Sequence, residues 1–156
     1  MKRILFVCLG NICRSPTAKA VFDARLRRAG LAIETDSAGT IGYHAGSPPD
    51  PRAMHLARQR GLDLSDQRAR ELRERDFERF DMIYVMDRDN LEAVLRRRPS
   101  SASARVELVM SLAPDYGIDE VPDPYYGGEN GFVRVVDMLE AAADRLARQL
   151  SERRTG

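Results

Sequence analysis

The sequence predicts an α/β fold: a single domain, residues 1–156, with a four-stranded parallel sheet and helices on both of its faces. Two observations favour this fold. Residues 4–7 form an unbroken apolar run, as expected for a strand that is buried on both faces of a parallel sheet. Further along, short apolar runs alternate with segments of helical periodicity, which is the pattern of successive βα units.

The first predicted helix follows this strand after a short loop. Ser15 is a good N-cap residue, Pro16 suits the first helical position, and Gly30 is placed to end the helix. The apolar residues between them recur at helical spacing: Ala18, Val21, Phe22, Leu26 and Ala29.

The later elements continue the alternation of strands and helices. Residues 31–36 are predicted as the second strand, and a helix that Asp50 caps and Pro51 opens ends at Gly61. Residues 82–86 and 106–110 are predicted as the third and fourth strands, with a helix between them. The last helix begins near Gly131, and its single apolar stripe is expected to pack against the sheet.

The loop after the first strand is predicted to bind phosphate. Five residues separate Cys8 from Arg14, which is enough for backbone N–H groups to converge on one centre beside the positive end of the helix dipole. Gly10 and Asn11 permit left-handed or close-approach backbone. Arg14 can donate two parallel hydrogen bonds to phosphoryl oxygens. The predicted phosphate-binding residues are Leu9, Gly10, Asn11, Ile12, Cys13, Arg14 and Ser15.

Cys8 is the predicted nucleophile. A thiol near a helix N-terminus and a guanidinium should have a pKa well below its free value of about 8.5, so that the thiolate forms near neutral pH. Ser15 can donate its hydroxyl to this sulfur. The alternative is a buried core cysteine, which would leave Arg14 without a reason to lie beside a core strand.

Asp123 is the predicted proton donor. Pro122 and Pro124 stiffen the chain on both sides of it, and Tyr125 and Tyr126 follow directly. Partial desolvation in such a loop would raise the pKa of the carboxyl and let it donate a proton near neutral pH. The alternative is an ordinary Asp-Pro turn.

Composition excludes several classes of protein. Lys and Arg number 25 against 24 Asp and Glu, so a net charge of +1 gives no reason to expect nucleic acid or a membrane as partner. The two cysteines lie in one loop, which fits a reducing, cytoplasmic location. His44 and His55 lack companions at ligand spacing, so we expect neither a metal nor a cofactor.

The chain resembles the low-molecular-weight protein tyrosine phosphatase family. Five segments carry the resemblance, in the family's order: residues 7–16, 36–40, 48–52, 86–87 and 123–126. The resemblance implies hydrolysis of phosphotyrosine in proteins, with phosphate or vanadate as ligands. Cys8 would form a phosphocysteine, Arg14 would bind the phosphoryl oxygens, and Asp123 would act as general acid and base.

The resemblance also implies supporting roles. The hydrogen-bonded brace of the loop would consist of Asn11, Ser15 and Ser37. The slot for the substrate ring would be lined by Ile12, Tyr43, His44, Tyr125 and Tyr126. Gln67 stands where many members carry a histidine, which puts in doubt any role of that histidine in supporting the loop. Cys13 would form a transient disulfide with Cys8 during oxidation, or else fill space as a small apolar residue.

Three other functions are alternatives to phosphotyrosine hydrolysis for a chain of this kind. Arsenate reductases of this fold need further cysteines, and both cysteines of this chain lie in the loop. A protein-arginine phosphatase of the same fold has a threonine where Ile12 stands, and Ile12 favours an aromatic ring. A catalytically silent phosphate-binding module would have no need of an acid such as Asp123.

Overall fold

A four-stranded parallel sheet forms the centre of the protein. The computed structural model describes residues 1–124 and 128–155. The strands are β1 (Arg3–Cys8), β2 (Glu34–Gly39), β3 (Met82–Val85) and β4 (Arg105–Leu108), in the order β2-β1-β3-β4. Every pairing is parallel, as predicted, so all four carboxyl ends lie along one edge of the sheet.

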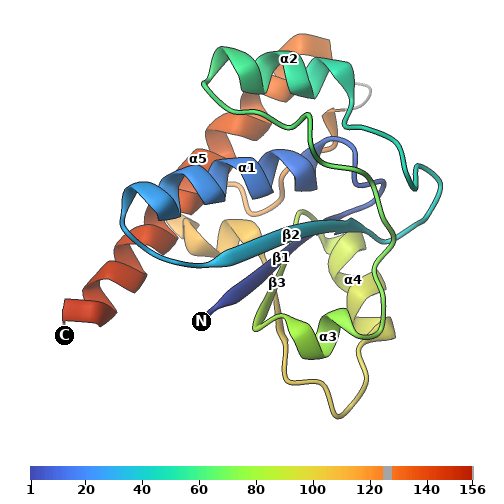
Figure 1. Ribbon diagram of the computed structural model, residues 1–156, viewed down its shortest axis with the longest axis vertical. Helices are drawn as coiled ribbons and strands as arrows, with labels where there is room; N and C mark the ends of the chain where they lie inside the picture. Colours follow the sequence, from blue (N-terminus) through green and yellow to red (C-terminus); the bar gives the residue numbers. More distant parts are fainter. Residues whose placement is uncertain (125–127, 156) are drawn as a thin grey trace.

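Helices cover both faces of the sheet, which confirms the predicted layers (Figure 1). The helices are α1 (Arg14–Arg28), α2 (Pro51–Gln59), α3 (Asp76–Arg79), α4 (Arg88–Arg97) and α5 (Gly128–Thr155), with two 3₁₀ turns, η1 (Val109–Leu112) and η2 (Pro114–Tyr116). Helices α1 and α5 pack together on one face, α3 and α4 lie on the other, and α2 packs against α5. Among the described residues, no helix has the combination of length and apolar character needed to span a membrane.

The inner strand β1 is buried on both sides, as its apolar run predicted. Phe6 packs with Phe22 of α1, with ring centroids 4.6 Å apart, and Cys8 belongs to the same core. Leu5 and Val7 point into the second core, beneath α3 and α4. Alternate side chains of β1 therefore pack into the cores on opposite faces of the sheet. This packing fixes the strand, and Cys8 is its last residue, at the carboxyl edge.

Several predicted boundaries are confirmed. Asp50 accepts a hydrogen bond from the Arg52 N–H at the start of α2. Gly30 and Gly61 follow α1 and α2 with φ angles of +74° and +78°, the left-handed conformation that ends helices.

The prediction that Ser15 is the N-cap of α1 is wrong. The helix begins at Arg14, and Cys13 is its N-cap residue without a side-chain capping bond. The hydroxyl of Ser15 lies instead 3.1 Å from the Cys8 sulfur. The helix begins two residues earlier than predicted, at Arg14 rather than Pro16, and this start places both Arg14 and Ser15 against the loop.

Other boundaries differ by a few residues. Strand β2 begins at Glu34 rather than near Leu31, β4 ends at Leu108 because the 3₁₀ turn η1 follows it, and α5 begins at Gly128. Helix α3 was not predicted, since four residues are too few for a periodic signal.

Candidate active site

A pocket of about 370 Å³ opens at the carboxyl edge of the sheet. It brings together the three predicted catalytic residues, Cys8, Arg14 and Asp123. The remaining lining residues are Leu9, Gly10, Ile12, Cys13, Ile41, Tyr43 and His44. Of the predicted slot residues, Tyr125 and Tyr126 lie outside the described residues, and Ile41 is an addition that the sequence did not suggest.

The Cys8 sulfur sits at the end of β1 among hydrogen-bond donors. The backbone N–H of Asn11 points at the sulfur over 3.3 Å, and the Ser15 hydroxyl lies 3.1 Å away. The side chain is 3% exposed, so water stabilises it little. The Asn11 N–H donates to the sulfur, and the Ser15 hydroxyl can donate to it as well, so both contacts would favour a sulfur that carries negative charge.

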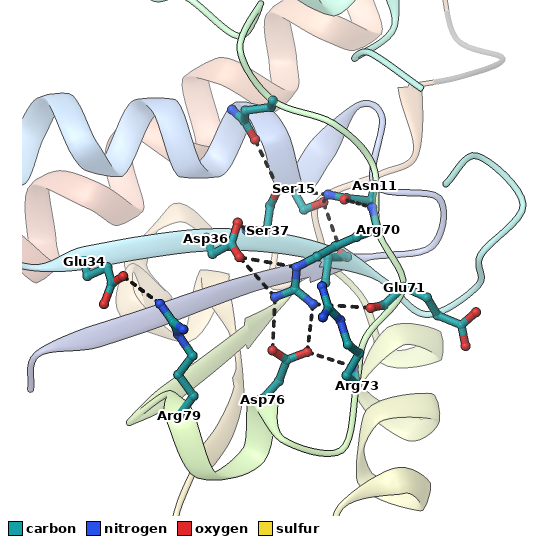
Figure 2. A network of polar contacts seen from close by, with 12 residues as sticks. Asn11, Ser15, Glu34, Asp36, Ser37, Arg70, Glu71, Arg73, Asp76 and Arg79 are labelled. Atoms are coloured by element: carbon teal, nitrogen blue, oxygen red, sulfur yellow. Dashed lines mark hydrogen bonds and ion pairs between the residues drawn. The ribbon is translucent and has the colours of Figure 1, made fainter. Parts of the chain in front are cut away.

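Asn11 connects the loop to three other segments (Figure 2). Its φ of +59° is the left-handed conformation that asparagine tolerates best among residues with a side chain. Its side-chain amide donates to Ser15 Oγ over 2.7 Å and to Ser37 Oγ over 3.0 Å, and its Oδ1 accepts from the Arg70 N–H over 2.9 Å. The predicted brace of Asn11, Ser15 and Ser37 is therefore present as a set of contacts.

Gly10 matters because another segment packs closely against its backbone, and its own backbone is not left-handed. A Cβ atom at this position would lie 2.9 Å from Cδ2 of His44. The absence of a side chain lets the loop that carries Tyr43 and His44 close over the phosphate-binding loop. Tyr43 itself is 84% exposed and meets the His44 ring edge-on at 4.8 Å.

Arg14 is buried and fixed in place. One terminal nitrogen, Nη1, donates to Asp87 Oδ2 over 2.6 Å and to the carbonyl of Val121 over 3.0 Å. The other, Nη2, lies 3.8 Å from Asp123 Oδ2 at the pocket. Burial acts to lower the pKa of Arg14, but the electrostatic influence of the Cys8 side chain and the hydrogen bond to Asp87 outweigh burial and raise this pKa, so the guanidinium stays charged.

Asp87 pairs with Arg14 beside the pocket, and the sequence singled it out only as part of the matching segment 86–87. It lies just after β3 and is the N-cap of α4, with Oδ1 accepting from the Asn90 N–H over 2.8 Å. Its other oxygen holds Arg14. The Asp-x-x-Asn capping pattern after a buried strand was the available signal, but nothing in it points to Arg14.

Arg70 ties the segment after α2 to the same loop. Its backbone donates to Asn11, while its guanidinium binds both oxygens of Asp76, over 2.9 and 3.0 Å, and reaches Asp36 over 3.1 Å (Figure 2). These ion pairs join the start of α3 to strand β2. They hold the backbone of Arg70 where it meets the loop.

Asp123 lies at the mouth of the pocket. It is flanked by Pro122 and Pro124 as predicted, and its side chain is 41% exposed. The carboxylate thus faces Arg14 on one side and solvent on the other, so it can exchange protons with water and with a group held in the pocket.

Cys13 lines the pocket and also packs into a hydrophobic core cluster. It packs with Ala53, Leu56 and Phe132, and burial raises the pKa of its thiol well above the ordinary value. Cys13 therefore stays protonated at physiological pH. Both cysteines are free thiols, and the disulfide between them stays a prediction.

No metal site is found within residues 1–124 and 128–155: no group of three His, Cys, Asp or Glu side chains is close enough to hold an ion.

Comparison with known proteins identifies relatives over the whole chain. Residues 3–155 match the family described as low molecular weight phosphotyrosine protein phosphatase. A low molecular weight protein-tyrosine-phosphatase of Streptomyces coelicolor is 43% identical over 159 residues, covering 99% of this chain and 96% of the relative.

Solved structures agree. A protein tyrosine phosphatase from Entamoeba histolytica, crystallised with Hepes in its active site, superposes with a TM-score of 0.92 at 40% identity and covers 99% of each chain. An arginine phosphatase from Drosophila superposes with a TM-score of 0.88 at 30% identity, covering 96% of this chain and 98% of its own.

Replacing Arg14 by lysine should weaken phosphate binding by on the order of tenfold or more, although the charge is kept. The single lysine nitrogen cannot hold Asp87 and the Val121 carbonyl and still bind two phosphoryl oxygens. The inhibition constant of inorganic phosphate measures the effect. The matched control is Arg60→Lys, at an arginine that pairs with Asp137 and Glu140 on the surface. Equal inhibition constants for both variants would contradict the prediction that Arg14 binds the phosphoryl oxygens.

Proposed function

This chain belongs to the low molecular weight phosphotyrosine protein phosphatase family and is a protein-tyrosine phosphatase, and we propose that it acts through a phosphocysteine formed at Cys8. The observation that carries the proposal is the shared pocket of Cys8, Arg14 and Asp123. These are a nucleophile, an anion-binding group and a proton donor, which together suffice for transfer of a phosphoryl group.

The first half of the reaction forms the covalent intermediate. The Cys8 thiolate attacks phosphorus, a P–S bond forms, and the P–O bond to the tyrosyl oxygen breaks. Asp123 gives its proton to that departing oxygen, so tyrosine leaves as a neutral phenol. The exposed position of Asp123 at the pocket mouth supports this role, because the leaving group must face solvent.

The second half returns the enzyme to its starting state. Asp123, now a carboxylate, takes a proton from water as the water oxygen attacks phosphorus. The P–S bond breaks, and inorganic phosphate and the Cys8 thiolate result. The Ser15 hydroxyl and the Asn11 N–H, at 3.1 and 3.3 Å from the sulfur, support this step because they stabilise the charge on the departing sulfur.

Arg14 stabilises the charge on the transferring phosphoryl group. Asp87 and the Val121 carbonyl occupy Nη1, while Nη2 lies near Asp123 in the residues that line the pocket. A fixed, buried guanidinium reorganises little during the reaction, and such preorganised charge is where most electrostatic catalysis comes from.

Phosphotyrosine is the proposed substrate among phosphorylated side chains. Ile12, Tyr43 and His44 line the pocket and offer apolar and aromatic surface to a phenyl ring. A protein-arginine phosphatase activity is the second candidate, favoured by the structural similarity to the Drosophila arginine phosphatase. A silent phosphate-binding module is disfavoured, since a binding site alone needs no acid beside Arg14.

The proposed location is the cytoplasm, and the proposed partners are tyrosine-phosphorylated proteins. Two free thiols close together in one loop support a reducing compartment.

Replacing Cys8 by serine should abolish turnover while vanadate still binds, because the loop amides and Arg14 remain. Steady-state hydrolysis of phenyl phosphate and isothermal titration with vanadate are the two measurements. Turnover within tenfold of the wild type would reject Cys8 as the nucleophile.

Replacing Asp123 by asparagine should slow phenyl phosphate by about 10²- to 10⁴-fold, because phenol leaves poorly without a proton. A substrate whose leaving group is strongly acidic, such as dinitrophenyl phosphate, should lose much less. The ratio of the two kcat values measures the effect. Equal losses for both substrates would argue against proton donation.

Turnover of matched peptides tests the substrate class. Phosphotyrosine should be hydrolysed with a kcat/KM at least about tenfold above phosphoserine and phosphoarginine, since only the phenyl ring fills the apolar slot. Preference for phosphoarginine would replace the first candidate by the second.

A further inference from the structure

The mouth of the catalytic pocket carries exposed apolar side chains. Among the described residues, seven large hydrophobic side chains are exposed, and three of them line this one pocket: Leu9, Ile41 and Tyr43. A single exposed hydrophobic residue is ordinary on a protein surface, whereas several gathered at a pocket indicate a surface that another molecule covers. Tyr43 is assigned to the slot for the substrate ring, but the side chains of Leu9 and Ile41 have no part in the proposed mechanism.

Leu9 and Ile41 lie on two neighbouring loops. Leu9 directly follows β1, Ile41 follows β2 after one further residue, and the Ile41 N–H donates to the Leu9 carbonyl over 3.2 Å. Their exposed fractions are 45% and 43%. Because both residues also line the pocket, they form one apolar area at its mouth, which we call the Leu9–Ile41 patch.

The loop that carries Ile41 is held firmly in place. Its two ends, at Gly39 and at residues 46–47, make four backbone hydrogen bonds of 2.8–2.9 Å with residues 69–72. The patch is therefore presented on a surface whose backbone is already ordered. A partner that covers such a surface pays little to order it, so even a small apolar contact there contributes to binding.

The geometry of an extended peptide predicts which substrate side chain would meet the patch. Successive side chains of an extended chain point to opposite sides, and alternate ones are about 7 Å apart. When phosphotyrosine enters the pocket, the residues directly beside it point away from the enzyme. The residues two positions away point toward the enzyme surface, and one of them would cover Leu9 and Ile41.

We propose that Leu9 and Ile41 form a specificity subsite for an aliphatic side chain two residues away from phosphotyrosine in the protein substrate. The inference rests on the proposed function, because it requires phosphotyrosine to occupy the pocket. It gives Ile41 a role in choosing among phosphotyrosine sites, which cleavage of the phosphate ester itself does not require.

Matched phosphotyrosine peptides test the proposal. All have alanine around the phosphotyrosine, except for one leucine placed one or two positions before it or after it. With the wild-type enzyme, leucine at one of the two outer positions should raise kcat/KM roughly three- to tenfold above the all-alanine peptide, because its side chain is buried on the patch. Leucine directly beside the phosphotyrosine should change kcat/KM by less than about twofold.

The Ile41→Ser variant should reduce this leucine preference to less than about twofold, since it removes apolar surface from the patch. The preference is the ratio of kcat/KM for the leucine and alanine peptides, so an effect common to both peptides cancels. Ile41→Leu keeps the apolar surface and should retain the preference.

The matched control is Ile118→Ser. Ile118 is 39% exposed, close to the value for Ile41, and it is not among the described residues that line the catalytic pocket. This variant should keep the wild-type preference. Thermal unfolding of each variant checks that it folds.

Equal kcat/KM for all peptides, a preference only for leucine directly beside phosphotyrosine, or an undiminished preference in Ile41→Ser would overturn the subsite. So would an equal loss of preference in Ile118→Ser. A wild-type dimer that Ile41→Ser converts to a monomer, with the peptide preference unchanged, would show a contact between two copies instead. If the wild-type enzyme hydrolyses no phosphotyrosine peptide, the proposed function falls together with the subsite. Hydrolysis of all the peptides at one rate overturns the subsite alone.

Discussion

The side-chain amide of Asn11 is the contact on which the geometry of the site depends. A loop that turns in five residues has few internal hydrogen bonds of its own, so its shape must be fixed from outside. Asn11 fixes the shape of the loop in two ways. Its own backbone is left-handed, and its side chain makes three hydrogen bonds, each to a different segment of the chain. Aspartate would lose both N–H donors, and alanine would lose all three bonds.

The polar contacts at the sheet edge are arranged around a frame that hydrophobic burial supplies. Strand β1 packs Phe6 into one core and Leu5 into the other, so its carboxyl end is held rigidly where Cys8 must lie. The parallel register places the end of β2 with Ser37 beside it. Among the described residues, no buried side-chain nitrogen or oxygen is left without a hydrogen-bond partner, which is what a rigid polar site requires.

Sequence patterns predicted the fold, and they singled out Cys8, Arg14 and Asp123, which the structure brings together in one pocket, because both depend on local signals. The apolar run of β1, the spacing of Cys8 and Arg14, and the proline-flanked Asp123 each have a direct physical meaning in one stretch of chain. What could not be predicted depends on contacts across the chain. Serine is a residue type that commonly caps helices, so the sequence pointed to Ser15 as the N-cap. Only the structure shows that its hydroxyl lies against the Cys8 sulfur instead. Arg70 and Gln67 likewise read as polar loop residues, since their partners are more than thirty residues away or lie on another element.

Asp87 has two structural roles that separate residues usually fill: it caps a helix and it holds a side chain of the site. One of its oxygens begins α4 and the other holds Arg14. When the first turn of α4 opens in a local fluctuation, the guanidinium loses its carboxylate partner and keeps only the Val121 carbonyl at Nη1. By thermodynamic linkage, an anion held by Arg14 makes such opening rarer. Occupancy of the pocket thus slows solvent exchange of amides in a helix that never meets the substrate.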